Sequence, residues 1–197
     1  MKTILQVEDD PNDVFLMQHA MQRLGITNPV QVARDGQEAM DYLQGAGKFA
    51  DRTAFPFPCL VLLDLKLPYV MGLDVLRWIR QQPGPALPVL MLTASGEDAD
   101  IAAAYYLGAN AFLTKPSEAS KFQEMVKAIK EFWLTHNTLP QETYAERSAA
   151  YSREINPDAN SIPRVNGARC EVWPHDAAAK KSRSLSASRR AENGAGS

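Results

Sequence analysis

The chain has 197 residues, a formal net charge of −2 and 45% hydrophobic residues, enough apolar material for one core of ordinary size. No apolar run approaches the ~18 residues that a membrane span needs, and no leader of charged and then apolar residues opens the chain. We therefore expect a soluble, cytoplasmic protein with no membrane span. The two cysteines have no partner at metal-ligand spacing, which argues against a zinc site.

The composition of the chain changes near Pro140. Residues 141–197 hold only six Val, Ile, Leu, Phe or Trp residues, and their 9 Lys and Arg outnumber their 7 Asp and Glu. So few large apolar side chains cannot offset the entropy that is lost when a segment becomes ordered. The sequence therefore predicts one domain over residues 1–140, followed by a low-complexity, disordered and basic tail over residues 141–197.

Five short apolar runs predict β-strands, and an amphipathic helix is predicted after each of them. In chain order, the strands are expected at residues 3–7, 30–33, 59–64, 88–93 and 111–113. The helices are expected at residues 11–24, 36–44, 72–82, 96–107 and 122–133. This alternation indicates an α/β fold with a parallel sheet and helices on both faces. The strand order expected for five such strands is 2-1-3-4-5, a doubly wound, flavodoxin-like three-layer sandwich.

Three of the predicted helices have recognisable capping residues. Asp10 precedes Pro11, which suits the first position of a helix. Asp35 and Glu38 match a capping box, and Ser95 is the cap expected for the fourth helix. The sequence thus places each of these helices closely after a strand.

Charged and hydroxyl side chains stand at the carboxyl ends of four predicted strands. They are Glu8, Asp9 and Asp10 after the first strand, Asp64 at the end of the third, Thr93 at the end of the fourth and Lys115 after the fifth. In the 2-1-3-4-5 order these four strands are consecutive neighbours, and open α/β sheets bind their ligands at this edge. We therefore expect these side chains to form one site, apart from Asp10, which caps a helix.

The residue types at this edge suit phosphoryl transfer. Clustered carboxylates repel one another, and they cannot all ionise cheaply without a cation. Their oxygens, beside a backbone carbonyl, suit Mg²⁺, which keeps open positions that hold phosphoryl oxygens. Lys115 would add a positive charge and Thr93 a hydroxyl donor. Asp64 is the candidate nucleophile and would form an aspartyl phosphate. Each residue alone has an ordinary structural explanation, so the prediction depends on their combination.

Two other kinds of phosphate site fit the sequence less well. The segment around Lys48 lacks the first glycine and the Ser or Thr of a nucleotide-binding P-loop. A phosphohydrolase with an aspartate nucleophile would need a second Asp two residues after Asp64, where this chain has Lys66. The sequence therefore favours a phosphoacceptor over an enzyme with a separate substrate.

Four segments resemble the motifs of response-regulator receiver domains of two-component signalling: ILQVEDDP, LVLLDLKLPYVMG, PVLMLTAS and GANAFLTKP. The resemblance implies that Asp64 is the phosphoacceptor. It implies that Mg²⁺ is bound by Asp64, by Asp9 directly, by Glu8 through water, and by the backbone carbonyl of Lys66. The long loop before Cys59 and the opening VEDDPND are most similar to stand-alone, single-domain regulators of bacterial phytochrome-type histidine kinases.

The resemblance also implies roles for three residues beyond the metal site. Lys115 would pair with the phosphoryl group, and Thr93 would shift toward it. Phe112 occupies the place of an aromatic switch residue that is often Tyr in the family. Because Phe112 has no hydroxyl, its switching would work through packing alone.

These roles imply a phosphorelay switch that promotes its own phosphotransfer and dephosphorylation. Its phosphoryl donor would be a histidine kinase or phosphotransfer protein, and its output would be protein–protein contact. A homodimer through the face of the last helix, fifth strand and fourth helix is one candidate assembly. The tail lacks a helix-turn-helix pattern, so no specific nucleic acid binding is expected. The alternative left open is that its basic end contacts nucleic acid or membrane as an output.

Overall fold

The computed structural model describes residues 2–82, 87–94 and 96–138. Its strands are β1 (Thr3–Val7), β2 (Val30–Ala33), β3 (Pro58–Leu63), β4 (Val89–Thr93) and β5 (Ala111–Thr114). Its helices are α1 (Pro11–Arg23), α2 (Gly36–Gln44), α3 (Gly72–Gln81), α4 (Asp98–Tyr106) and α5 (Ala119–Ile129), with a 3₁₀ turn η1 (Gly47–Phe49) and a π-helical segment η2 (Lys130–His136). No helix within these ranges is both long and apolar enough to cross a membrane. The predicted domain end at residue 140 and the predicted tail lie outside the described residues.

The strands form one parallel sheet in the order β2-β1-β3-β4-β5, as predicted. Val7, the last residue of β1, is in register with Ala33 on β2 and with Leu63 on β3. Thr93, the last residue of β4, is in register with Thr114 on β5. Since the carboxyl ends are aligned in this way, the residues that follow the strands stand at one edge of the sheet.

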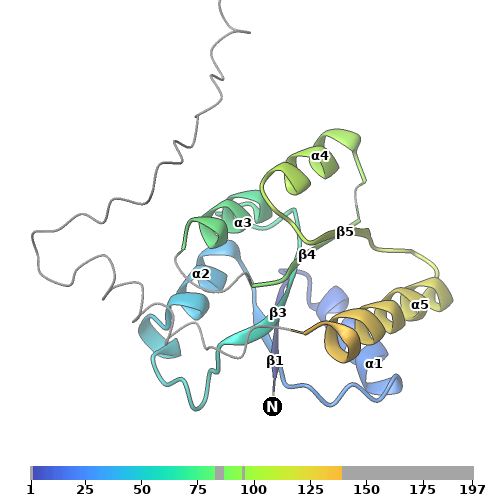
Figure 1. Ribbon diagram of the computed structural model, residues 1–197, viewed down its shortest axis with the longest axis horizontal. Coiled ribbons are helices and arrows are strands. Elements are labelled where there is room, and N and C mark those ends of the chain that lie inside the picture. Colours follow the sequence, from blue (N-terminus) through green and yellow to red (C-terminus); the bar gives the residue numbers. More distant parts are fainter. Residues whose placement is uncertain (1, 83–86, 95, 139–197) are drawn as a thin grey trace, which may run out of the picture. The chain divides into compact units, whose positions relative to one another are not determined.

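Helices cover both faces of the sheet (Figure 1). On one face α1 and α5 pack together, and their residues Met17 and Val126 join Ile4 of β1 in a buried apolar cluster. On the other face α2, α3 and α4 enclose a second cluster, which includes Leu5 of β1 and Val75 of α3. Neighbouring residues of β1 thus serve opposite clusters, because successive side chains of a strand point to opposite faces. The near-continuous apolar runs of the inner strands follow from burial on both faces.

The helix starts confirm two of the three predicted caps. Asp10 accepts a hydrogen bond from the Asn12 amide at 2.8 Å and stands just before Pro11. Asp35 accepts one from the Glu38 amide at 2.7 Å, although the Glu38 carboxylate binds the amide of residue 34 rather than that of Asp35. The prediction for the fourth helix was wrong, because α4 begins at Asp98 with Glu97 as its cap residue. Ser95 itself lies outside the described residues.

The end of α5 is tied to α1 by Lys130. Its Nζ donates to the carbonyl oxygen of Leu24 at 2.7 Å, and Leu24 is the cap residue at the end of α1. A cation at a helix C-terminus interacts favourably with the helix dipole. Trp133 and Leu134 of η2 continue the contact by packing against the apolar cluster on this face. This contact therefore holds α1 and α5 together at the end that lies away from the carboxyl ends of the strands.

Candidate functional site

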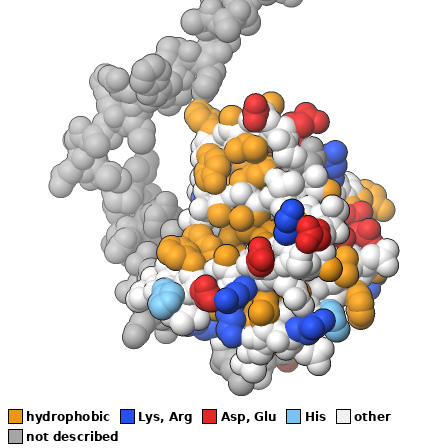
Figure 2. Space-filling model, turned by 90° about the vertical axis from the view of Figure 1, so that its right-hand side faces the viewer, with side chains coloured by type: hydrophobic (Ala, Val, Ile, Leu, Met, Phe, Trp, Pro, Cys, Tyr) orange, Lys and Arg blue, Asp and Glu red, His pale blue; other side chains and the backbone are white. Residues whose placement is uncertain are grey.

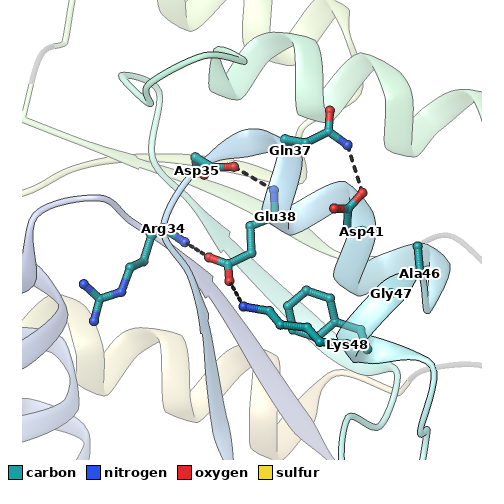
Figure 3. A pocket seen from close by; sticks show the side chains of 9 residues that line it. Arg34, Asp35, Gln37, Glu38, Asp41, Ala46, Gly47 and Lys48 are labelled. Carbon is teal, nitrogen blue, oxygen red and sulfur yellow. Dashed lines mark hydrogen bonds and ion pairs between the residues drawn. The ribbon is translucent and has the colours of Figure 1, made fainter.

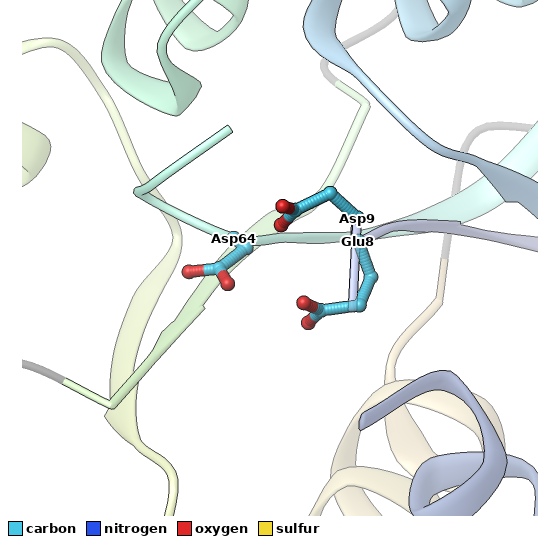
Figure 4. Close-up of side chains that lie close together, drawn as sticks. All are labelled: Glu8, Asp9 and Asp64. Carbon is cyan, nitrogen blue, oxygen red and sulfur yellow. The ribbon is translucent and has the colours of Figure 1, made fainter. Parts of the chain in front are cut away.

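The carboxylates of Glu8, Asp9 and Asp64 lie together at the carboxyl edge of the sheet (Figure 4). Glu8 and Asp9 come directly after β1, and Asp64 comes directly after β3, which lies beside it. One oxygen from each of the three carboxylates lies within 4.8 Å of the others. Glu8 and Asp64 are buried, whereas Asp9 is exposed. The structure thus gathers the three predicted acids into a group that is open to solvent at Asp9.

Asp64 is held by the backbone around it. The Leu65 amide donates to Asp64 Oδ1 at 2.6 Å, and the Asp64 amide donates to the Val7 carbonyl at 3.0 Å. Gly72, the first residue of α3, passes so close that an added Cβ would lie 2.0 Å from the carbonyl oxygen of Asp64. A residue without Cβ is needed for such an approach. Backbone groups therefore hold both the main chain of Asp64 and one of its two carboxylate oxygens.

Lys115 enters the site from the loop between β5 and α5. Its Nζ lies 2.5 Å from Glu8 Oε2, 2.7 Å from Asp13 Oδ2 and 3.1 Å from Asp64 Oδ2. The Lys115 amide donates to the Thr93 carbonyl at 2.7 Å, which fixes the start of the loop. An ammonium group has three donors. Each of these donors therefore has a carboxylate partner.

Burial and charge act in opposite directions on the two most enclosed ionisable groups. Burial raises the pKa of Glu8 from 4.5 to about 7, although its hydrogen bond and attraction to Lys115 oppose the rise. Burial also disfavours the charge of Lys115, but hydrogen bonds to Asp13 and Glu8 outweigh it and raise the pKa of the ammonium. Lys115 is therefore cationic at neutral pH, and Glu8 holds a proton for part of the time when no metal is bound.

The predicted switch residues lie on neighbouring strands. Thr93 ends β4 and is buried, with 1% of its surface exposed. Phe112 on β5 is in register with Met91 and packs against the apolar cluster beneath α2, α3 and α4. Its amide lies 3.3 Å from the hydroxyl oxygen of Tyr105 on α4, to which it donates. The two residues therefore connect the site edge to the α4 side of the sheet.

Lys66 and Asp13 complete the surroundings of the carboxylates. The Lys66 amide lies 3.4 Å from Asp64 Oδ1, so Lys66 belongs to the same loop, and the role of its carbonyl stays a prediction. Sequence reasoning missed Asp13, because an acid in the first turn of a helix is already explained by the helix dipole. The available signal was topological, since the first turn of α1 starts at the same sheet edge from which Lys115 projects.

One surface hollow on the described part of the chain does not involve these residues. It has a volume of about 550 Å³ and lies over α2 and η1 (Figure 3). Its polar groups bind one another: Lys48 Nζ donates to Glu38 at 2.6 Å and Gln37 donates to Asp41 at 2.9 Å. A second hollow, of about 370 Å³, borders the site, and its lining includes Glu8, Asp9, Phe15 and Arg34. Of these two hollows, the one of about 370 Å³ therefore adjoins the clustered carboxylates.

Comparison with known proteins identifies the family of this fold and site. The model of the response regulator receiver domain matches residues 4–127. The chain belongs to the response regulator receiver family. The receiver is 39% identical over 140 residues to the response regulator Rcp1 of Synechocystis sp. (strain ATCC 27184 / PCC 6803 / Kazusa), covering 71% of this chain and 93% of Rcp1.

Solved structures agree with this assignment. The Mn²⁺-bound form of Rcp1 is 39% identical and superposes with a TM-score of 0.64, covering 71% of this receiver and 99% of that chain. The phosphorylated cyanobacterial phytochrome response regulator RcpA is 39% identical with a TM-score of 0.65, again covering 71% and 99% of the two chains. Both the two-component signalling family and the doubly wound five-stranded fold predicted from the sequence are confirmed.

The donor atoms of the receiver site fit a hard divalent cation. Mg²⁺ takes oxygen ligands, commonly one or two carboxylates, and keeps several waters. The three carboxylates supply only oxygen, and the exposure of Asp9 leaves room for waters and for a phosphoryl group. No imidazole or thiol takes part in this cluster of described residues, so its chemistry favours Mg²⁺ or a similar ion over zinc.

Proposed function

We propose that this receiver accepts a phosphoryl group on Asp64 from a histidine kinase or phosphotransfer protein, with Mg²⁺ held by Glu8, Asp9, Asp64 and the carbonyl of Lys66. The observation that carries the proposal is the placement of the largely enclosed Lys115 ammonium and three carboxylates around the end of β3. Phosphorylated RcpA and Mn²⁺-bound Rcp1, which are similar to this chain, support the same chemistry.

Each residue would contribute a defined part of the transfer. An oxygen of Asp64 attacks phosphorus, and a P–O bond forms as the P–N bond to the donor histidine breaks and the imidazole keeps the electron pair. Mg²⁺, when bound, neutralises the developing charge on the phosphoryl oxygens. Lys115 donates hydrogen bonds to the same group from the β5 side, and the Thr93 hydroxyl donates from the end of β4. Hydrolysis of the acyl phosphate releases inorganic phosphate and returns the carboxylate of Asp64.

A direct test uses acetyl phosphate as the donor, with acetate as the leaving group. The wild-type protein with Mg²⁺ should gain an acid-stable, base-labile phosphoryl label, and Asp64→Asn should gain none because an amide is not a nucleophile here. Asp9→Ala should bind Mg²⁺ much more weakly and lose labelling, since one of few protein oxygens is gone. Equal labelling of wild type and Asp64→Asn would refute the assignment.

The output would be protein–protein contact through the face made by α4, β5 and α5. Hydrophobic side chains gather on that side of the molecule (Figure 2). Tyr105 and Tyr106 of α4 are 52% and 76% exposed. This face would serve a target or a second copy of the chain, and comparing the sedimentation of free and beryllofluoride-bound protein distinguishes the two. The alternative output through the basic tail concerns residues outside the described ranges.

A further inference from the structure

We propose that Asp13 is a positioning residue, which holds the Lys115 ammonium beside Asp64 when a metal ion engages the carboxylate of Glu8. The inference rests on the proposed phosphoacceptor function and adds a residue to it. Asp13 belongs to the first turn of α1 rather than to a strand end. Its Oδ2 lies 2.7 Å from Lys115 Nζ, and its side chain is 34% exposed while that of Lys115 is 9% exposed.

The argument begins with the competition for Lys115. The ammonium binds Glu8, Asp13 and Asp64, and these contacts use its three donors. Two of the three carboxylates, Glu8 and Asp64, also belong to the group whose oxygens can surround a metal ion. A metal that draws on these oxygens weakens their bonds to the ammonium. The carboxylate of Asp13 is the partner of Lys115 that lies outside that group.

The consequence concerns where Lys115 points once the metal is bound. A lysine has a flexible four-carbon side chain, and an ammonium that lost two partners would gain rotamer freedom. The charge-assisted bond to Asp13 retains it at the edge of the site, with donors left for phosphoryl oxygens. The Thr93 carbonyl already fixes the backbone of Lys115. Asp13 therefore fixes the ammonium, at the far end of the Lys115 side chain.

The direction in which anion affinity changes when Asp13 is removed distinguishes a positioning role from a purely electrostatic one. A carboxylate near the site repels an incoming anion, so removing Asp13 would strengthen anion binding if charge were its only contribution. If Asp13 positions Lys115, its removal weakens anion binding instead. Asp13→Ala should bind beryllofluoride, measured by fluorine NMR at saturating Mg²⁺, about tenfold more weakly than wild type, as expected for a lost charge-assisted hydrogen bond. Asp13→Asn should show most of this loss, and Asp13→Glu should recover part of the affinity.

Two further variants complete the experiment. Asp74→Ala is the matched control, because Asp74 is also a first-turn acid in an ion pair, with Arg77 on α3, and should leave binding unchanged. Asp13→Ala should slow labelling by concentrated acetyl phosphate when Lys115 is present. In a Lys115→Ala background it should not, since no ammonium remains to be positioned. Unchanged or tighter beryllofluoride binding by Asp13→Ala would overturn the role of Asp13. A wild-type protein that neither binds beryllofluoride nor labels would instead overturn the proposed function.

Discussion

At the residue scale, the Lys115 ammonium has three carboxylate partners, and a fourth carboxylate lies close to them. Lys115 contacts Glu8, Asp13 and Asp64 directly, and Asp9 lies beside two of these acids. Without a metal ion, this arrangement concentrates excess negative charge at an edge where Glu8 is only 3% exposed. Burial raises the pKa of Glu8 most, and the like charges of Asp64 and Asp13 add to the rise. The site is thus prepared for a cation at some cost to the metal-free protein.

Replacing Glu8 with Gln should therefore remove a loss of stability that the metal-free wild type suffers as the pH rises toward 7. The pKa of Glu8 is raised by burial from 4.5 to about 7, so between these values the folded protein keeps a proton that the unfolded chain has released. Wild-type stability consequently falls as pH rises through this window, whereas Gln has no proton to lose. We compare the unfolding free energies of Glu8→Gln and wild type, measured with urea in EDTA. Their difference should shift in favour of Glu8→Gln by on the order of 2 kcal/mol between about pH 5 and about pH 8.

Glu38→Gln provides a control of opposite sign. Burial of Glu38 is outweighed by hydrogen bonds from Lys48 and from the Arg34 amide, which lower its pKa. A carboxyl group with a lowered pKa stabilises the folded protein at pH values above its ordinary pKa. This stabilisation is lost as the pH falls through the lowered pKa. Glu38→Gln should thus cost stability at neutral pH, with a smaller cost in acid. If the metal-free wild type and Glu8→Gln showed parallel pH profiles, the elevated pKa of Glu8 would be wrong.

At the scale of elements, the turn from β3 into α3 places the candidate nucleophile. Gly72 opens α3, and its amide donates to the Leu65 carbonyl at 3.0 Å. Gly72→Ala would put a Cβ 2.0 Å from the Asp64 carbonyl oxygen, so the loop must move. We expect a loss of about 2 kcal/mol or more in unfolding free energy, as for other insertions into close-packed regions. Phosphoryl labelling of the folded fraction should also slow, because Asp64 moves with its backbone.

Gly25→Ala is the matched control for this turn. Gly25 adopts φ of +65° after α1, and an added Cβ would meet nothing within 4 Å. Its replacement should cost only the strain of a left-handed residue, about 1 kcal/mol, and should not change labelling. Equal labelling rates for folded Gly72→Ala and Gly25→Ala would show that the close approach of Gly72 does not position Asp64.

The switch proposed for Thr93 and Phe112 predicts a change across several elements. A phosphoryl group at Asp64 gives the Thr93 hydroxyl a strong acceptor, and its movement changes the packing available to Phe112. Because Phe112 also donates its amide to Tyr105, α4 should respond. Amide chemical shifts on adding beryllofluoride should change over residues 99–134 as well as at the carboxylates. Shifts limited to the metal site would contradict this switch.

Residues at strand ends were predictable because a buried apolar run fixes where its strand stops. Asp64 follows β3 and Thr93 ends β4 in the structure, and the predicted strand order brings both to the edge that Lys115 reaches. The ion pair of Asp13 with Lys115 was not predictable in this way, since 102 residues separate the partners and no local pattern links them.

Two local features were also missed. Glu97 has no side-chain hydrogen bond as a cap, so the start of α4 has no capping signal in the sequence. The π-helical segment η2 follows Lys130, whose ammonium reaches Leu24 across 106 residues. Capping patterns describe neighbours in the chain, whereas the bond between Lys130 and Leu24 depends on residues brought together by the fold.

For the whole molecule, the receiver core should be independent of the tail. The two apolar clusters that flank the sheet draw on described residues from Ile4 to Leu134. A chain ending at Gln141 should therefore unfold in urea within ~1 kcal/mol of the full chain, a small part of the ~5–15 kcal/mol typical of a domain. It should also label with acetyl phosphate at a similar rate. A loss above ~2 kcal/mol would move the domain boundary beyond residue 140.

The wide separation of the site residues along the chain has a consequence for protein synthesis. Lys115 follows Asp64 by 51 residues and Glu8 by 107 residues. At ~5–20 residues per second, a ribosome needs about 3–10 s to pass from the Asp64 codon to the Lys115 codon. During that interval the nascent chain has its acids but neither their ammonium partner nor the edge strand β5. The complete set of site residues can therefore assemble only after β5 and the loop that carries Lys115 have been synthesised.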